Sequence, residues 1–196
     1  MNYRMKKFLL PLLAIVALLA ACVPSVNPFY TDKDVITDAR LAGTWIGDEG
    51  KDDSVAWKFE SVTNNFYAVL FTEEKNKTGK FEGRLFKLGE ETLLDLTPTE
   101  CNFATNQASI VSMAIIPGHL LLRVKFLEQS LSLAFCDPDW VGKFLEKNPT
   151  AIAHRKVDGN VILTAETAAL QKFVLKHLGE GELFGKTGDY KRAAAK

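Results

Sequence analysis

Cys22 is the residue whose chemistry and position stand out most in this chain. It follows a basic start, with three Lys or Arg residues among the first seven, and an apolar run over 8–19 that only Pro11 interrupts. The run is shorter than the roughly 20 residues that a membrane-spanning helix needs. A basic start, a short apolar run and small residues before a cleavage point are typical of a secretory signal peptide. We therefore expect residues 1–21 to be removed, which makes Cys22 the first residue of the mature chain.

The stretch Leu19-Ala20-Ala21-Cys22 resembles the lipobox of bacterial lipoproteins. The resemblance implies that the sulfur of Cys22 receives a diacylglyceryl group before cleavage. Two or more acyl chains hold a protein stably on a membrane, whereas one holds it only marginally. Val23, rather than an aspartate, follows the cysteine, and by resemblance to known sorting patterns this implies the outer membrane of a two-membrane cell. The expected location is thus a bacterial membrane, facing the periplasm or the cell surface.

The other two cysteines, Cys101 and Cys136, form a disulfide candidate, because disulfides persist in exported proteins. Their bond would close a loop of roughly 36 residues, worth about 3.8 kcal/mol in chain entropy before native strain. The alternative is two unrelated buried thiols. A redox pair is disfavoured, since the chain has no Cys-x-x-Cys motif.

Composition limits the partners. The signal holds three of the 24 basic residues and none of the 24 acidic ones, so the mature chain carries a net charge of about −3. The remaining Lys and Arg residues are scattered, which argues against nucleic acid as a partner. Length suits one domain. We predict a signal peptide over 1–21, a flexible lipidated tether over 22–40 reaching about 20–25 Å, and a domain over 41–196.

Other residue patterns do not predict an enzyme. The histidines at 119, 154 and 177 are too far apart for a zinc motif, so we expect no metal and no cofactor. The acidic pairs at 52–53, 73–74 and 90–91 fall at predicted turns, where solvated charge explains them better than acid–base catalysis. The stretch 181–187 has three rather than four residues between its glycines and follows a helix, so a polar turn explains it better than a phosphate loop.

Alternating apolar and polar residues with turn signals between them predict an antiparallel meander in a sandwich or a barrel. One clear case places Val55, Trp57 and Phe59 on the same face of a strand. The segment 110–116 is apolar but short, so a strand and a buried helical turn both stay open. The predicted strands cover 41–47, 55–60, 66–72, 80–88, 92–97, 120–127 and 131–136, with a turn at 76–79.

Two short helices are predicted in the last third. Asp137 caps the first, which should end by 147–148, and Pro138 fits its first turn. A hairpin over 151–163 follows, turning at 158–160. Thr164 is the expected cap of the second helix, and Gly179 is its expected end. A short strand is expected at 188–192.

Gly43-Thr44-Trp45, at the start of the first strand, is similar to the opening motif of lipocalins. The resemblance implies a lipocalin-like barrel of 8–10 strands, with Trp45 filling its closed end, Gly43 letting the strand bend and a helix packed outside. The helix after 137 and the extra hairpin depart from that plan. The layout from the lipobox through Asn27-Pro28-Phe29-Tyr30 also resembles uncharacterised bacterial lipoproteins, which implies no activity.

From these features we expect a non-enzymatic, lipid-anchored envelope protein. Its barrel would hold a small apolar ligand if one end is open, because eight strands leave room for one ligand at most. The alternative is an assembly or scaffold lipoprotein whose barrel is filled and whose outer face binds a protein partner. An interior pocket would favour the first, and an exposed apolar patch on a filled barrel would favour the second.

Overall fold

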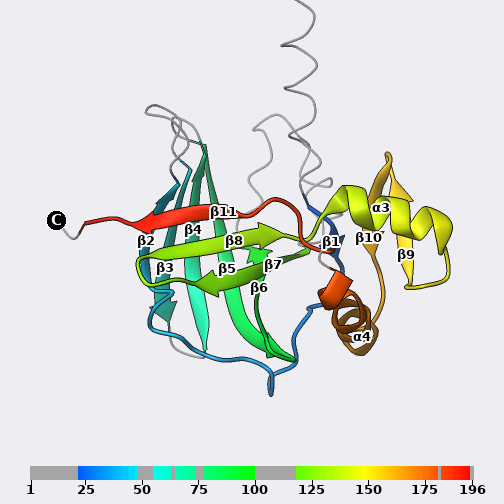
Figure 1. The fold of residues 1–196 in the computed structure, drawn as a ribbon, viewed down its shortest axis with the longest axis horizontal. Coiled ribbons are helices and arrows are strands. Elements are labelled where there is room, and N and C mark those ends of the chain that lie inside the picture. Colours follow the sequence, from blue (N-terminus) through cyan, green and yellow to red (C-terminus); the bar gives the residue numbers. More distant parts are fainter. Residues whose placement is uncertain are drawn as a thin grey trace, which may run out of the picture.

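The structure is a computed structural model that describes residues 22–47, 55–62, 65–73, 77–99, 118–180 and 182–194. These residues form a closed antiparallel β-barrel, with two helices and a hairpin packed against one side of it (Figure 1). The predicted fold class, a mainly β chain that closes into a lipocalin-like barrel, is confirmed.

The barrel has eight strands, most of which are joined to the next in the chain as a meander. β11 lies between β2 and β8, and pairing of β6 with β7 closes the ring. The strands are β2 (Gly43–Gly47), β3 (Ala56–Val62), β4 (Phe66–Glu73), β5 (Lys77–Leu88), β6 (Glu91–Pro98), β7 (His119–Phe126), β8 (Ser130–Phe135) and β11 (Gly188–Arg192).

Side chains fill the barrel interior. The Trp57 ring lies 4.4 Å from the ring of Phe71 and 6.2 Å from that of Phe135, measured between centroids. Gly83 is an interior position without a side chain, and a Cβ added there would lie 3.0 Å from a methyl of Val69. The space left by this glycine is therefore already occupied by its neighbours. The buried interior residues are Leu41, Trp45, Trp57, Phe59, Tyr67, Val69, Leu85, Leu94, Leu96, Leu122, Val124, Leu131 and Leu133.

A second core lies outside the barrel, where outward-facing apolar side chains of β5 to β8 meet the C-terminal elements. These elements are α3 (Pro138–Lys147), β9 (His154–Val157), β10 (Asn160–Leu163), α4 (Thr167–His177) and the 3-10 helix η2 (Leu178–Glu180). Leu121 of β7 and Ala134 of β8 belong to this core, together with Leu145 of α3 and Leu170 of α4. One face of the barrel is thus covered, and no other described element packs over the opposite face.

The helix and hairpin predictions hold in outline. Asp137 caps α3 as predicted, because its Oδ1 accepts the backbone N–H of Trp140 at 2.8 Å. The predicted cap Thr164 was wrong, since α4 begins after Glu166, whose side chain makes no capping bond. The helix also runs on through Gly179 as a 3-10 turn instead of ending there.

Of two other sequence predictions, one is wrong and one is not tested by the described residues. Residues 77–79 belong to β5 rather than to the predicted turn, because Thr78 pairs with Thr72 and Gly79 with Phe71 across the hairpin. The segment 110–116, left open between a strand and a helical turn, lies outside the described residues.

The segment after Cys22 is not the flexible tether predicted from its prolines and polar residues. Val23 is 2% exposed and Ser25 is 0% exposed. Strand β1 (Pro24–Ser25) pairs with β7 on one side and with β10 on the other, and it lies between the barrel and α3 in Figure 1. Phe29 is buried in the second core. The backbone pairing of β1 explains why this segment is ordered despite its composition.

Candidate functional site

Trp45 lies at the end of the barrel where the N-terminal segment crosses it. The indole is 4% exposed, and its Nε1 donates a hydrogen bond to the carbonyl of Leu41 at 2.9 Å. The Tyr67 hydroxyl joins the same segment, because it accepts from the backbone N–H of Asp38 at 2.8 Å and donates to its carbonyl at 3.0 Å. Burial raises the pKa of the Tyr67 hydroxyl above its usual value, which keeps it a hydrogen-bond donor. This end of the barrel is therefore closed.

Arg192 completes the closure, and the sequence did not point to it. Its guanidinium lies over the Trp45 ring at 4.4 Å from the centroid. Nη1 donates to the carbonyl of Ala42 at 2.8 Å, and Nη2 donates to that of Arg40 at 2.6 Å. The register between β11 and β2 pairs Arg192 with Trp45 directly. In the sequence, Arg192 is visible only as a basic residue in the last predicted strand. Its contact with Trp45 could not be predicted without the β2–β11 register.

Gly43 is required where it stands. Its φ of +133° lies in the range that side chains other than glycine rarely adopt. A Cβ at this position would also collide with the Arg192 guanidinium. Gly43 and Trp45, the two residues taken from the lipocalin resemblance, thus share one structural unit with Arg192.

A groove of about 620 Å³ lies beside this closed end and contains several cations. Arg192 already donates to two carbonyls, and Arg40 forms an ion pair with Asp38 at 2.6 Å. The guanidinium groups of Arg40 and Arg192 therefore already bind other groups of the protein. Their role is to close the barrel end rather than to bind an anion.

Cys22 lies in a second groove, of about 330 Å³, between α3 and the β9–β10 hairpin. Burial raises the pKa of the Cys22 thiol to about 11. Residues from three elements line this groove: Cys22, Val23, Pro138, Asp139, Gly142, Lys143, Glu146, Lys156, Gly159, Asn160 and Val161.

Cys136 is a buried free cysteine at the end of β8. Burial first, and then the charges of Asp137 and Cys22, raise the pKa of its thiol to about 12. Its predicted partner, Cys101, lies outside the described residues, so the disulfide stays a prediction.

A buried Asp–His pair is a second feature that sequence patterns did not reveal. Asp95, which is 1% exposed, lies on the outer face of β6, and its Oδ1 is 2.7 Å from Nδ1 of His119 on β7. The other oxygen of Asp95 accepts the backbone N–H of Phe29 at 2.9 Å. Thr97 Oγ1 lies 3.1 Å from the same His119 nitrogen. The pair thus fastens the N-terminal segment to the barrel.

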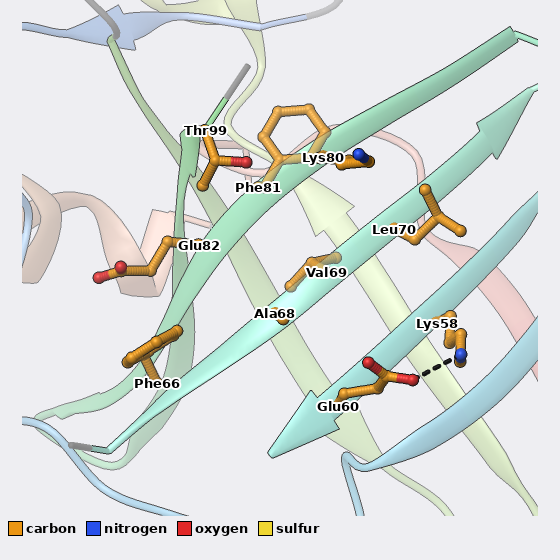
Figure 2. Close-up of a pocket in the computed structure, with 10 residues that line it drawn as sticks. All are labelled: Lys58, Glu60, Phe66, Ala68, Val69, Leu70, Lys80, Phe81, Glu82 and Thr99. Atoms are coloured by element: carbon orange, nitrogen blue, oxygen red, sulfur yellow. Dashed lines mark ion pairs between the residues drawn. The ribbon is translucent and has the colours of Figure 1, made fainter. Parts of the chain in front are cut away.

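A third groove, of about 270 Å³, crosses the outer face of β3, β4 and β5 on the side without helices. Figure 2 shows Ala68 and Leu70 of β4 along its floor, with Lys58 and Glu60 of β3 on one side. Lys58 Nζ and Glu60 Oε1 form an ion pair at 2.5 Å. Lys80 and Glu82 of β5 flank the other side in the same view, and Phe66 and Thr99 also line the groove.

Phe66 gives this groove an aromatic end. The Arg84 guanidinium lies 5.0 Å from the centre of the Phe66 ring and also pairs with Glu82 at 2.8 Å. A cation over one face of an aromatic ring holds that ring in place. The groove therefore combines an apolar floor with charged walls of both signs.

Within the described residues, no three His, Cys, Asp or Glu side chains gather as they would around a metal ion. Nor does that part of the chain contain a helix long and apolar enough to span a membrane. The glycine-containing stretch after α4 departs from the predicted polar turn, because Leu183 and Phe184 are buried in the second core.

No protein-family model, curated protein or solved structure matches this chain. The function must therefore be inferred from the geometry of the site itself.

Proposed function

We propose that this chain is a non-enzymatic, lipid-anchored protein of the bacterial cell envelope that acts as a scaffold for a protein partner. The lipobox-like Leu19-Ala20-Ala21-Cys22 supports the anchor. Its expected consequence is simple: Cys22→Ser should release the protein from membranes or trap the precursor. Fractionation unchanged by this substitution would contradict the anchor.

The filled barrel interior is the observation that carries the scaffold role. A Cβ added at Gly83 would already touch Val69, Leu94 and Leu96, so the middle of the barrel leaves no space for a ligand there. A barrel whose middle is filled in this way favours binding at its outer surface. The second core covers one side of the barrel, and among the described residues no element packs over the β3–β5 face.

The groove on the β3–β5 face suits a protein partner. Its floor presents the side chains of Ala68 and Leu70, and its walls carry Lys58, Glu60 and Lys80. An apolar centre with a charged rim is the usual arrangement at protein interfaces, where the centre supplies affinity and the rim supplies specificity. The strands beneath are paired on both sides, so the partner would bind through side chains rather than by adding a strand.

Two matched substitutions test the scaffold proposal. Leu70→Glu places a charge on the floor of the groove, whereas Leu175→Glu makes the same change at an exposed leucine on α4. We expect the protein extracted from its own membranes in mild detergent to migrate as a complex. Leu70→Glu should shift it to the size of the free protein, and Leu175→Glu should not. Free protein in all three samples, or equal behaviour of the two variants, would contradict the proposal.

Binding of a small apolar ligand is a second candidate function, and the buried indole nitrogen of Trp57 favours it. The indole Nε1 of Trp57 is buried and has no hydrogen-bond partner among the described residues. An unsatisfied buried donor is costly, and a ligand oxygen would satisfy it. The surrounding rings of Phe71 and Phe135 are apolar, so the fitting ligand would be an apolar molecule with one acceptor group.

Titration with a fluorescent fatty acid separates the two candidates. Ligand binding in the barrel should give saturable fluorescence that Trp57→Phe weakens about tenfold or more, since the donor is lost while most of the ring volume remains. Absence of saturable binding would leave the scaffold role alone.

A further inference from the structure

The site of lipid attachment is continuous with the folded domain. This inference rests on the proposed lipidation of Cys22. The next residue, Val23, is already buried, and the backbone N–H of Val26 donates to the carbonyl of Leu163 in β10 at 2.9 Å. The sheet therefore begins two residues after Cys22, with β1. A domain joined to its lipid in this way has little freedom to turn relative to the bilayer.

The surface around Cys22 must then be the one nearest to the lipid. Cys22 lies between α3 and the β9–β10 hairpin, and the Lys156–Glu146 ion pair of 3.0 Å joins these two walls. Gly142 on α3 and Gly159 in the hairpin turn leave the groove open, because a Cβ added at either would meet no atom within 4 Å. The glyceryl group on Cys22 can therefore leave through this groove without a change in the fold.

The groove rim carries charges of both signs. Lys143 and Lys156 are exposed and line the groove beside Asp139 and Glu146, and Lys143 can reach a lipid phosphate. Val157, at the end of β9, is 49% exposed. An exposed apolar side chain beside the lipid-bearing residue can enter the headgroup region of a bilayer.

We propose that the protein meets the membrane in one fixed orientation, through a membrane face made of α3 around Lys143 and Lys156 of β9, which line the Cys22 groove, together with the neighbouring exposed Val157 at the end of β9. Figure 1 shows α3 and the β9–β10 hairpin on one side of the barrel and β2, β3 and β4 on the opposite side. The fixed orientation thus directs the β3–β5 groove away from the lipid, where a partner can reach it.

Depth-dependent quenching tests this orientation. The mature lipidated protein is reconstituted into vesicles of phosphatidylethanolamine and phosphatidylglycerol, with or without bromine on the acyl chains. Tryptophan is introduced as Val157→Trp in the membrane face or as Val62→Trp, a matched exposed valine (39%) at the end of β3. The emission of the unsubstituted protein is subtracted in each case.

We expect brominated lipid to quench the tryptophan at position 157 at least about twofold more than the one at position 62. Hydrogen exchange of residues 155–160 should also slow on reconstitution, relative to Cys22→Ser in solution, whereas exchange around residue 62 should not change. Equal quenching at the two positions with unchanged exchange would overturn the fixed orientation. Protein that carries no lipid and does not float with the vesicles would instead refute the proposed anchoring, so the two failures are distinguishable.

Discussion

Removal of the Trp45 side chain is the substitution with the largest expected effect on the barrel. Trp45→Ala deletes a buried indole, and such truncations cost about 3–5 kcal/mol. That figure includes the hydrogen bond to the Leu41 carbonyl, which contributes about 0.5–1.5 kcal/mol. A small domain is stable by only about 5–15 kcal/mol, so the loss is a large share of the total.

Substitution of Arg192 allows the free energy of its cation–π contact with Trp45 to be measured separately. The guanidinium is exposed, so its cation–π contact with the indole should contribute only about 0.5–1 kcal/mol. In a double-mutant cycle, Trp45→Ala combined with Arg192→Ala should therefore be less destabilising than the sum of the two single changes by about that amount.

Equilibrium denaturation of the mature, unlipidated Cys22→Ser protein measures these energies, with far-ultraviolet circular dichroism as the signal because tryptophan emission changes with the substitution. In a variant with Trp57 and Trp140 replaced by Phe, the remaining Trp45 should resist quenching by iodide. A cost below about 1 kcal/mol together with ready quenching would refute a tryptophan-closed barrel end.

Three further changes have defined outcomes. Gly43→Ala should destabilise the domain by about 1–3 kcal/mol in denaturant titrations, because its φ of +133° strains a residue that carries a Cβ, and a neutral result would refute that strain. Asp95→Ala should cost about 1–3 kcal/mol and speed hydrogen exchange at the amide of Phe29, since this buried N–H loses its acceptor; unchanged exchange would contradict the fastening role. Hydrogen bonds, first from Thr31, lower the pKa of Asp34, so its stabilisation is complete above the usual aspartate pKa of about 3.9 and is lost as pH falls through the lowered value. Asp34→Asn should therefore flatten the acid limb of a stability-versus-pH curve, and an unaltered limb would rule out this contribution.

The barrel could be predicted from the sequence because its signal is local. Each strand alternates apolar and polar residues with a period of two, and polar turns separate the strands. The Asp137 cap and Pro138 predict the start of α3 for the same reason, since capping involves residues close in sequence. These short patterns predict an antiparallel meander, and the resemblance of Gly43-Thr44-Trp45 to the lipocalin motif then favours a barrel.

The N-terminal segment could not be predicted in this way. Val23 and Ser25 are buried by β7 and β10, which lie about a hundred or more residues further along the chain. Prolines and polar residues hide this pairing, because they are equally typical of a flexible linker. The order of the segment comes from distant backbone partners, and no local pattern contains them.

The candidate sites show the same limit. Trp45 and Gly43 were visible as a motif, but their partner Arg192 was not, because only the β2–β11 register brings it to the indole. Asp95 and His119 likewise meet only through the closing pair of strands, β6 and β7. The groove over β3–β5 depends on three strands lying side by side, so it could be located only in the structure.

Mass spectrometry of the N-terminal peptide, taken from the protein in the membranes of a bacterium that expresses it, tests the central claim most directly. The predicted peptide begins at Cys22 and carries the added mass of a diacylglyceryl group with at least two acyl chains. An N-terminal peptide that still contains residues 1–21, or a Cys22 with no added mass in membrane-associated protein, would contradict the proposed anchor.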